Sequence, residues 1–195
     1  TGYRNIDLLI QQALKLQPNT VVVSDEAEYK KVNEALWTAD IHVYAGKEAL
    51  IQVLESGEVE LVLNAIAGFA GIAPTIAAIN ARKQVALANT ESILVAGELV
   101  TKLAREKGVN IYPIDPKQSS IFQCIIGEFH NKIEKIYLTA QEGSLKNVDA
   151  KSGIDSASMM RAGFAAIQAK WLFNVKPAQI EILVHKQAII DGLVQ

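Results

Sequence analysis

The stretch Val59-Glu-Leu-Val-Leu-Asn-Ala-Ile66, followed by Ala67-Gly-Phe-Ala-Gly-Ile-Ala-Pro74, decides the fold of this 195-residue chain. Its first half is short and strongly apolar, which predicts a buried strand. Gly68 and Gly71 lie in the connection that follows, and Pro74 suits the first turn of a helix. The stretch is therefore a strand–loop–helix unit, the building block of a parallel sheet covered by helices.

The same alternation extends in both directions from this stretch. Short β-branched runs are separated by longer amphipathic segments, which is typical of an α/β fold with a doubly wound, Rossmann-like parallel sheet. We expect helices over residues 5–16, 25–37, 46–55, 74–82 and 92–107, and further strands over residues 21–23, 41–44, 85–88 and 111–114.

The pattern changes after Asp115. A short helix is expected over 119–127, and a strand of alternating polarity over 132–140, which suits a half-exposed, mixed or antiparallel sheet. A loop over 141–153, a helix over 155–173 and strands over 180–185 and 188–194 complete the chain. The sequence thus predicts a Rossmann-like domain over 1–116 and a smaller α+β domain over 117–195.

Composition excludes several classes of function. Half of the residues are hydrophobic, 21% are charged and the net charge is −2, which argues against a broad basic surface for nucleic acid. No apolar run approaches the length that crosses a bilayer. The single cysteine, Cys124, has no internal disulfide partner and stands among apolar residues. We therefore expect a cytoplasmic protein without a membrane partner, with Cys124 in the core.

Residue types alone indicate a site only weakly. The Gly68-x-x-Gly71 spacing would let backbone amides approach a phosphate, but glycines also simply permit a tight turn, and we favour the turn. Asp115 ends a predicted parallel strand, where ligands bind in this architecture. Its neighbour Lys117 would repel a cation, and divalent ions need several oxygen ligands. We therefore interpret Asp115 first as a helix cap.

A series of fragments, in order along nearly the whole chain, resembles the 1-deoxy-D-xylulose 5-phosphate reductoisomerase family. They are Asn64–Thr75, Ala86–Glu91, Tyr112–Asp115, Ser120–Gln123, Ile154–Ala157, Met159-Met160, Trp171–Phe173 and Val184-His185. The resemblance implies an NADPH-dependent enzyme that also needs magnesium or manganese. Such an enzyme rearranges and reduces 1-deoxy-D-xylulose 5-phosphate to 2-C-methyl-D-erythritol 4-phosphate in non-mevalonate isoprenoid biosynthesis. Members form homodimers through the central domain and carry a further carboxyl-terminal helical domain, which we expect to be absent from this protein.

The resemblance also implies roles for individual residues. Asn89 and Glu91 correspond to cofactor-binding positions, with Gly68 as a weaker candidate. Asp115 corresponds to a metal ligand, which we expect to be without its metal here. Ser156 and His185 match catalytic-site positions of the family but are remnants of incomplete motifs, so we assign no catalytic residue firmly.

The departures from the family pattern fall on functional positions. We expect the family's first βα unit with its glycine-rich phosphate loop to be absent, and the lysine of the A-N-K-E motif is Thr90. The metal motif D-S-E-H reads Asp115-Pro-Lys-Gln118, and M-N-K-G-x-E reads Met160-Arg-Ala-Gly-Phe-Ala165. The substrate motif S-G-G reads Gln141-Glu-Gly143, and H-P-Q-S reads His185-Lys-Gln-Ala188. Two of three metal carboxylates are therefore lost, one of them to a cation.

Three hypotheses follow. The first, which we favour, is a folded, dimeric but catalytically inactive scaffold of the family, either engineered or strongly diverged, that needs neither NADPH nor a metal. The second is an active NADPH- and metal-dependent reductoisomerase, or a relative, whose missing segments lie outside this sequence. The third is a module that binds another anion in the old cleft through Lys117, Arg161 and Lys186. We expect the homodimer to form through the carboxyl-terminal sheet.

Overall fold

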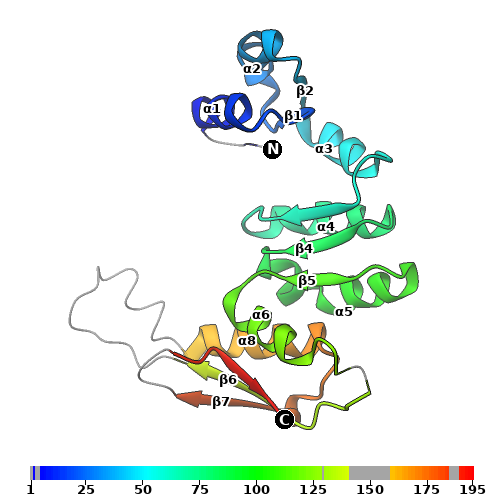
Figure 1. Cartoon of the computed structure of the whole chain (residues 1–195), viewed down its shortest axis with the longest axis vertical. Coiled ribbons are helices and arrows are strands. Elements are labelled where there is room, and N and C mark those ends of the chain that lie inside the picture. Colours follow the sequence, from blue (N-terminus) through cyan, green and yellow to red (C-terminus); the bar gives the residue numbers. More distant parts are fainter. Residues whose placement is uncertain (1, 3–4, 129, 141–158, 185–188) are drawn as a thin grey trace, which may run out of the picture. The chain divides into compact units, whose positions relative to one another are not determined.

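The structure is a computed structural model that describes residues 2, 5–128, 130–140, 159–184 and 189–195 (Figure 1). The chain forms two compact units, Thr1–Glu60 and Leu61–Gln195, which we call the amino-terminal and the carboxyl-terminal unit. This division differs from the predicted boundary between residues 116 and 117, which stays a prediction about the family's domains. Within the described residues no helix is long and apolar enough to cross a membrane.

The amino-terminal unit is a small α/β layer built on two parallel strands. Its elements are α1 (Ile6–Leu16), β1 (Thr20–Val23), η1 (Glu26–Glu28), α2 (Tyr29–Leu36), η2 (Trp37–Ala39), β2 (His42–Ala45) and α3 (Gly46–Glu55). β1 and β2 pair in parallel, and Val23, Val32 and Leu36 are fully buried between the strands and α2. Asn5 caps α1 by accepting a hydrogen bond from the Leu8 N–H at 3.0 Å, as the sequence predicts.

The carboxyl-terminal unit begins with a parallel sheet of three strands. The strands are β3 (Leu61–Asn64), β4 (Gln84–Leu87) and β5 (Ile111–Pro113), in the order β3-β4-β5. They are connected through η3 (Phe69–Gly71) with α4 (Ile72–Asn80) and through α5 (Thr90–Lys107). Val85 of the central strand, Ile79 of α4 and Val100 of α5 are fully buried. This βαβαβ order is the Rossmann-like pattern that the sequence predicts.

The second sheet of this unit is mixed. It contains β6 (Ile136–Ala140) between β7 (Ile180–Val184), which runs parallel to it, and β8 (Gly192–Val194), which runs antiparallel. Helices α6 (Pro116–Ile125) and α8 (Met159–Leu172) lie on one face (Figure 1), where Ile121, Ile136 and Leu138 form the centre of the core. Another 3₁₀ turn, η4 (Pro177–Gln179), leads into β7. Of the two alternatives that the alternation of polarity along β6 left open, a mixed or an antiparallel sheet, the structure has the mixed one.

The two sheets of this unit are joined by close helix packing. A Cβ added to Gly97 of α5 would lie 2.4 Å from Cδ1 of Trp171 on α8, so only glycine allows this approach. The neighbouring Ala96 departs from helical geometry, with φ −126° and ψ 25°, which kinks α5 at the contact. The α/β class, the parallel pairing and the smaller mixed sheet are therefore confirmed, although the first five strands pair as a two-stranded and a three-stranded sheet.

Candidate functional site

The candidate site lies where the three parallel strands of the carboxyl-terminal unit end. Asn64 is the last residue of β3, Asn89 follows β4 by two residues, and Asp115 follows β5 by two residues. Because the carboxyl ends of parallel strands share one edge of the sheet, these polar side chains belong to the same edge. Asn89 and Asp115 line one small cavity of about 10 Å³ there, which is room for about one water molecule.

Asn64 fixes the start of the loop that follows β3. Its side-chain Nδ2 donates to the carbonyl of Gly71 at 2.8 Å and to the Thr75 hydroxyl at 2.7 Å. Its Oδ1 accepts from the Ile66 N–H at 3.1 Å. The backbone carbonyl of Asn64 accepts from the N–H groups of Ala88 and Asn89 at 3.0 and 2.9 Å. Asn64 had no predicted role, although a lone amide at the end of an apolar strand is a usable signal.

Asn89 holds the same loop from the other side. Its Nδ2 lies within hydrogen-bonding distance of the carbonyls of Ile66 (2.5 Å) and Gly68 (2.9 Å) and of a Glu91 carboxylate oxygen (3.1 Å). Its Oδ1 accepts hydrogen bonds from the Ser92 N–H, at 2.8 Å, and from the Ser92 hydroxyl. Asn89 is thereby the N-cap of α5. The side chain is 2% exposed.

The loop itself needs glycine at two positions for different reasons. Gly68 has φ 76° and ψ −165°, a conformation that is essentially restricted to glycine, and no atom lies within 4 Å of a Cβ placed there. Gly71 has ordinary backbone angles, but an added Cβ would lie 2.6 Å from Cγ of Asn89. Between them Phe69 is 75% exposed. The loop is therefore tightly held on its inner side and open on its outer side.

Asp115 acts as the cap of α6. Its carboxylate accepts a hydrogen bond from the Gln118 N–H at 3.1 Å, and Pro116 occupies the first turn. Burial raises the pKa of the Asp115 carboxyl above its ordinary value, against the opposing effect of the backbone N–H groups of Gln118 and Lys117. The interpretation as a helix cap is confirmed.

The Lys117 side chain is partly buried against the end of β6. Its Nζ donates to the carbonyl of Thr139, at the end of β6, at 2.5 Å. Burial lowers the pKa of the Lys117 ammonium below its ordinary value, and the positive charge of Arg161 lowers this pKa further. The negative charges of Asp191 and Asp115 act in the opposite direction and raise it. Two cations and two carboxylates therefore influence one another at this place, with formal charges that cancel.

The residues described here do not provide a divalent-metal site. No group of three or more His, Cys, Asp or Glu side chains comes together among them. Asp115 already accepts a backbone hydrogen bond, and the cation Lys117 stands two residues away. Hard divalent ions need several oxygen ligands, so this set does not fit magnesium or manganese. Ser156, His185 and Lys186 lie outside the described residues.

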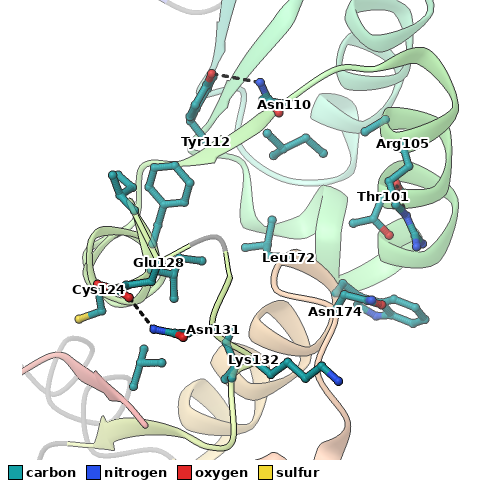
Figure 2. A pocket seen from close by; sticks show the side chains of 18 of the residues that line it. Thr101, Arg105, Asn110, Tyr112, Cys124, Glu128, Asn131, Lys132, Leu172 and Asn174 are labelled. Carbon is teal, nitrogen blue, oxygen red and sulfur yellow. Dashed lines mark hydrogen bonds between the residues drawn. The ribbon is translucent and has the colours of Figure 1, made fainter.

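The carboxyl-terminal unit also contains a larger hollow, which shares Leu172 with the small cavity lined by Asn89 and Asp115. It has a volume of about 910 Å³ and is lined from the end of α5, from β5, from α6 and from the chain around Asn131 (Figure 2). Tyr112 and Phe122 meet there edge to face, with ring centroids 5.8 Å apart. Cys124 lines this hollow and is exposed, so the prediction of a core position is wrong. Among its apolar neighbours in sequence, Ile121 is fully buried, whereas Phe122, Ile125 and Ile126 line the same hollow as Cys124.

Comparison with known proteins agrees with the sequence motifs. The family model described as 1-deoxy-D-xylulose 5-phosphate reductoisomerase matches residues 1–97. The reductoisomerase of Bacteroides thetaiotaomicron is 46% identical over 216 aligned residues, covering 100% of this chain and 55% of the relative. That of Porphyromonas gingivalis is 42% identical, covering 100% of this chain and 56% of the relative.

Solved structures give the same result. The Zymomonas mobilis reductoisomerase in complex with NADPH matches with a TM-score of 0.89 at 33% identity, over 100% of this chain and 55% of that one. A reductoisomerase in complex with NADPH, fosmidomycin and magnesium matches with a TM-score of 0.85 at 31% identity, again over 100% and 55%. The chain thus spans a little over half the length of these relatives. In sequence and in fold, over the whole of its length, it belongs to the 1-deoxy-D-xylulose 5-phosphate reductoisomerase family.

Proposed function

We propose that this chain is a folded but catalytically inactive member of the family, which does not assemble the divalent-metal centre. The observation that carries the proposal is the position of the Lys117 side chain in the former metal motif. Its ammonium is anchored to the Thr139 carbonyl, beside the one surviving carboxylate of the metal motif. A second cation, Arg161, is close enough to lower the pKa of Lys117.

The charge balance supports this proposal. Replacing a carboxylate by an ammonium changes the local charge by two units. The interaction energy of two unit charges roughly 4 Å apart, at an effective dielectric constant of about 20, is on the order of 4 kcal/mol. Asp115 alone cannot offset that repulsion of a divalent ion. The scaffold itself keeps its buried core.

An active reductoisomerase, or a relative with altered chemistry, is the alternative. The features that favour it are Asn89, Glu91 and Asp115 at family positions and the open space above Gly68, where a cofactor would approach the backbone. In that case NADPH would be held by the loop from Ile66 to Gly71. The bound cofactor would supply a hydride, and residues outside this sequence would complete its site.

An anion-binding module is the third reading, and Lys117 and Arg161 favour it. Asp191 and Asp115 already balance these two cations, because both raise the pKa of Lys117. A free anion would therefore have to compete with carboxylates of the chain itself. The simpler role for the two cations is therefore to keep this surface solvated and stable.

Manganese titration followed by electron paramagnetic resonance tests the proposal. We expect no bound ion at millimolar manganese in the parent chain. The Lys117→Glu variant should gain measurable affinity, because it replaces a positive by a negative charge next to Asp115, a change of two units. The matched control is Lys102→Glu, the same change at an exposed position of α5. Saturable binding to the parent chain that Lys117→Glu does not strengthen would contradict the proposal.

We also propose that the chain forms a homodimer through the sheet β7-β6-β8. Val184 and Leu193 on its edge strands and Ile189 before β8 are exposed, and an apolar sheet edge needs cover. Light scattering should give twice the mass of the chain. A monomer at micromolar concentration would remove this idea.

A further inference from the structure

Every polar side-chain atom of the two asparagines of the candidate site has a hydrogen-bond partner within the protein. A side-chain amide offers two hydrogens and one acceptor oxygen. Both hydrogens of Asn64 are used by Gly71 and Thr75, and its oxygen is used by Ile66. The two hydrogens of Asn89 are shared among three acceptors, and its oxygen accepts twice from Ser92. A ligand that accepted a hydrogen bond from the Asn89 Nδ2 would have to displace one of these partly buried partners.

We propose that Asn64 and Asn89 are positioning residues, which hold the loop from Ile66 to Gly71 in one preset conformation. In this assignment Asn89 makes no contact of its own with a ligand. The resemblance to the family implies a direct cofactor contact for Asn89, and Asn64 has no implied role at all. The proposal concerns the loop alone, so it holds whether or not the chain binds metal or turns over a substrate.

The orientation of the loop backbone follows from the two asparagines. The carbonyls of Ile66, Gly68 and Gly71 accept hydrogen bonds from their side-chain amides. In the part of the chain that the structure describes, the backbone N–H groups of residues 67–70 take part in no hydrogen bond. A ligand at this edge would therefore meet backbone donors and the exposed ring of Phe69.

Gly71 gives independent support for the clamp. Its backbone angles suit any residue, so conformational strain does not explain a glycine there. The close approach of Asn89 does, because an added Cβ would lie 2.6 Å from both Cγ and Nδ2 of that side chain. Asn89 is itself fixed by the α5 cap and is 2% exposed, so it has little freedom to move.

Limited proteolysis with chymotrypsin tests the proposal, because the enzyme cleaves after aromatic residues and Phe69 is exposed. A protease needs a locally unfolded segment, so the rate of cleavage after Phe69 reports how often the loop opens. We expect the parent chain to resist cleavage there. Fragments are identified by mass spectrometry, well below the melting temperature of each variant.

Asn89→Asp is the decisive variant. The carboxylate keeps the oxygen that caps α5 but cannot donate to the loop carbonyls. We expect cleavage after Phe69 to accelerate by roughly tenfold or more, while other cuts within Leu61–Gln195 change by less than about twofold. Asn64→Ala and Gly71→Ala should likewise accelerate cleavage of the peptide bond after Phe69. Asn110→Asp is the matched control, since it makes the same change at an exposed residue before β5.

Two results would overturn the proposal. Cleavage after Phe69 that stays within about twofold of the parent in both Asn89→Asp and Asn64→Ala would mean that the loop does not need the clamp. A uniform acceleration of all cuts in this unit would mean that the asparagines only stabilise the fold. If Asn64→Ala does not fold, Asn89→Asp and Gly71→Ala still decide between these outcomes.

Discussion

Replacing Thr75 by valine removes the hydroxyl at the centre of the buried polar network without changing the shape of the side chain. Thr75 is 0% exposed. Its Oγ1 accepts from Asn64 at 2.7 Å, donates to the Gly71 carbonyl at 2.9 Å and lies 3.3 Å from the Ser92 hydroxyl. Thr75→Val therefore leaves one hydrogen of the Asn64 amide buried without an acceptor.

The size of the effect follows from these contacts. A net hydrogen bond contributes about 1 kcal/mol, and a buried donor left unpaired costs about 1–3 kcal/mol. We therefore expect Thr75→Val to lower the free energy of unfolding of the carboxyl-terminal unit by about 2–3 kcal/mol. In a protein of this size that corresponds to a melting temperature lower by about 5–10 °C. Thr75→Ser keeps the hydroxyl and loses one methyl group, which costs only about 1 kcal/mol.

The assay is thermal unfolding followed by tryptophan fluorescence in a Trp37→Phe background. The chain has two tryptophans. Trp37 belongs to the amino-terminal unit and is exposed, so the remaining Trp171 reports on the carboxyl-terminal unit alone. The reasoning is refuted if Thr75→Val melts within about 1 °C of the parent. It is also refuted if Thr75→Ser costs more than Thr75→Val, because the methyl group and not the hydroxyl would then matter.

Three further predictions concern other parts of the carboxyl-terminal unit. Gly97→Ala should lower the free energy of unfolding by about 1–3 kcal/mol, because the new Cβ would overlap Trp171. Gly163 has open space around it in α8, so Gly163→Ala should raise the free energy of unfolding by about 0.5–1 kcal/mol. Urea unfolding measures both changes. Asp115→Ala should cost about 1 kcal/mol in the same assay through loss of the α6 cap, and Asp115→Asn much less. The raised pKa of Asp115 means that the folded state binds its proton more tightly than the unfolded state. This group therefore adds stability as pH falls through its raised pKa, and Asp115→Asn should remove that component from the pH profile; an identical profile in parent and variant would contradict the assignment.

Local sequence signals located most elements of the fold. The helix expected over 46–55 has these bounds in the structure, and Asn5 and Asp115 cap helices as their residue types suggest. The strand expected to reach Ile66 ends at Asn64, because the Asn64 side chain accepts the N–H of Ile66 and turns the chain. Apolar pattern alone does not reveal such a turn.

The candidate site was harder to predict because its contacts join residues distant in sequence. Asn64 meets Thr75 eleven positions later, and Lys117 meets Thr139 twenty-two positions later. No local pattern encodes these pairs. The rule that ligands bind at the carboxyl ends of parallel strands did single out Asp115, and the family resemblance pointed to Asn89. The sequence could not tell that the Asn89 amide is fully used within the protein.

Calorimetric titration of the purified chain with NADPH, with and without magnesium or manganese, decides whether the chain is an inactive member of the family. We expect no metal-dependent heat of binding and no metal-dependent thermal shift, from a protein that still melts cooperatively. We also expect no turnover of 1-deoxy-D-xylulose 5-phosphate. Micromolar binding of NADPH that strengthens with either metal, together with turnover, would contradict the proposal and establish an active reductoisomerase.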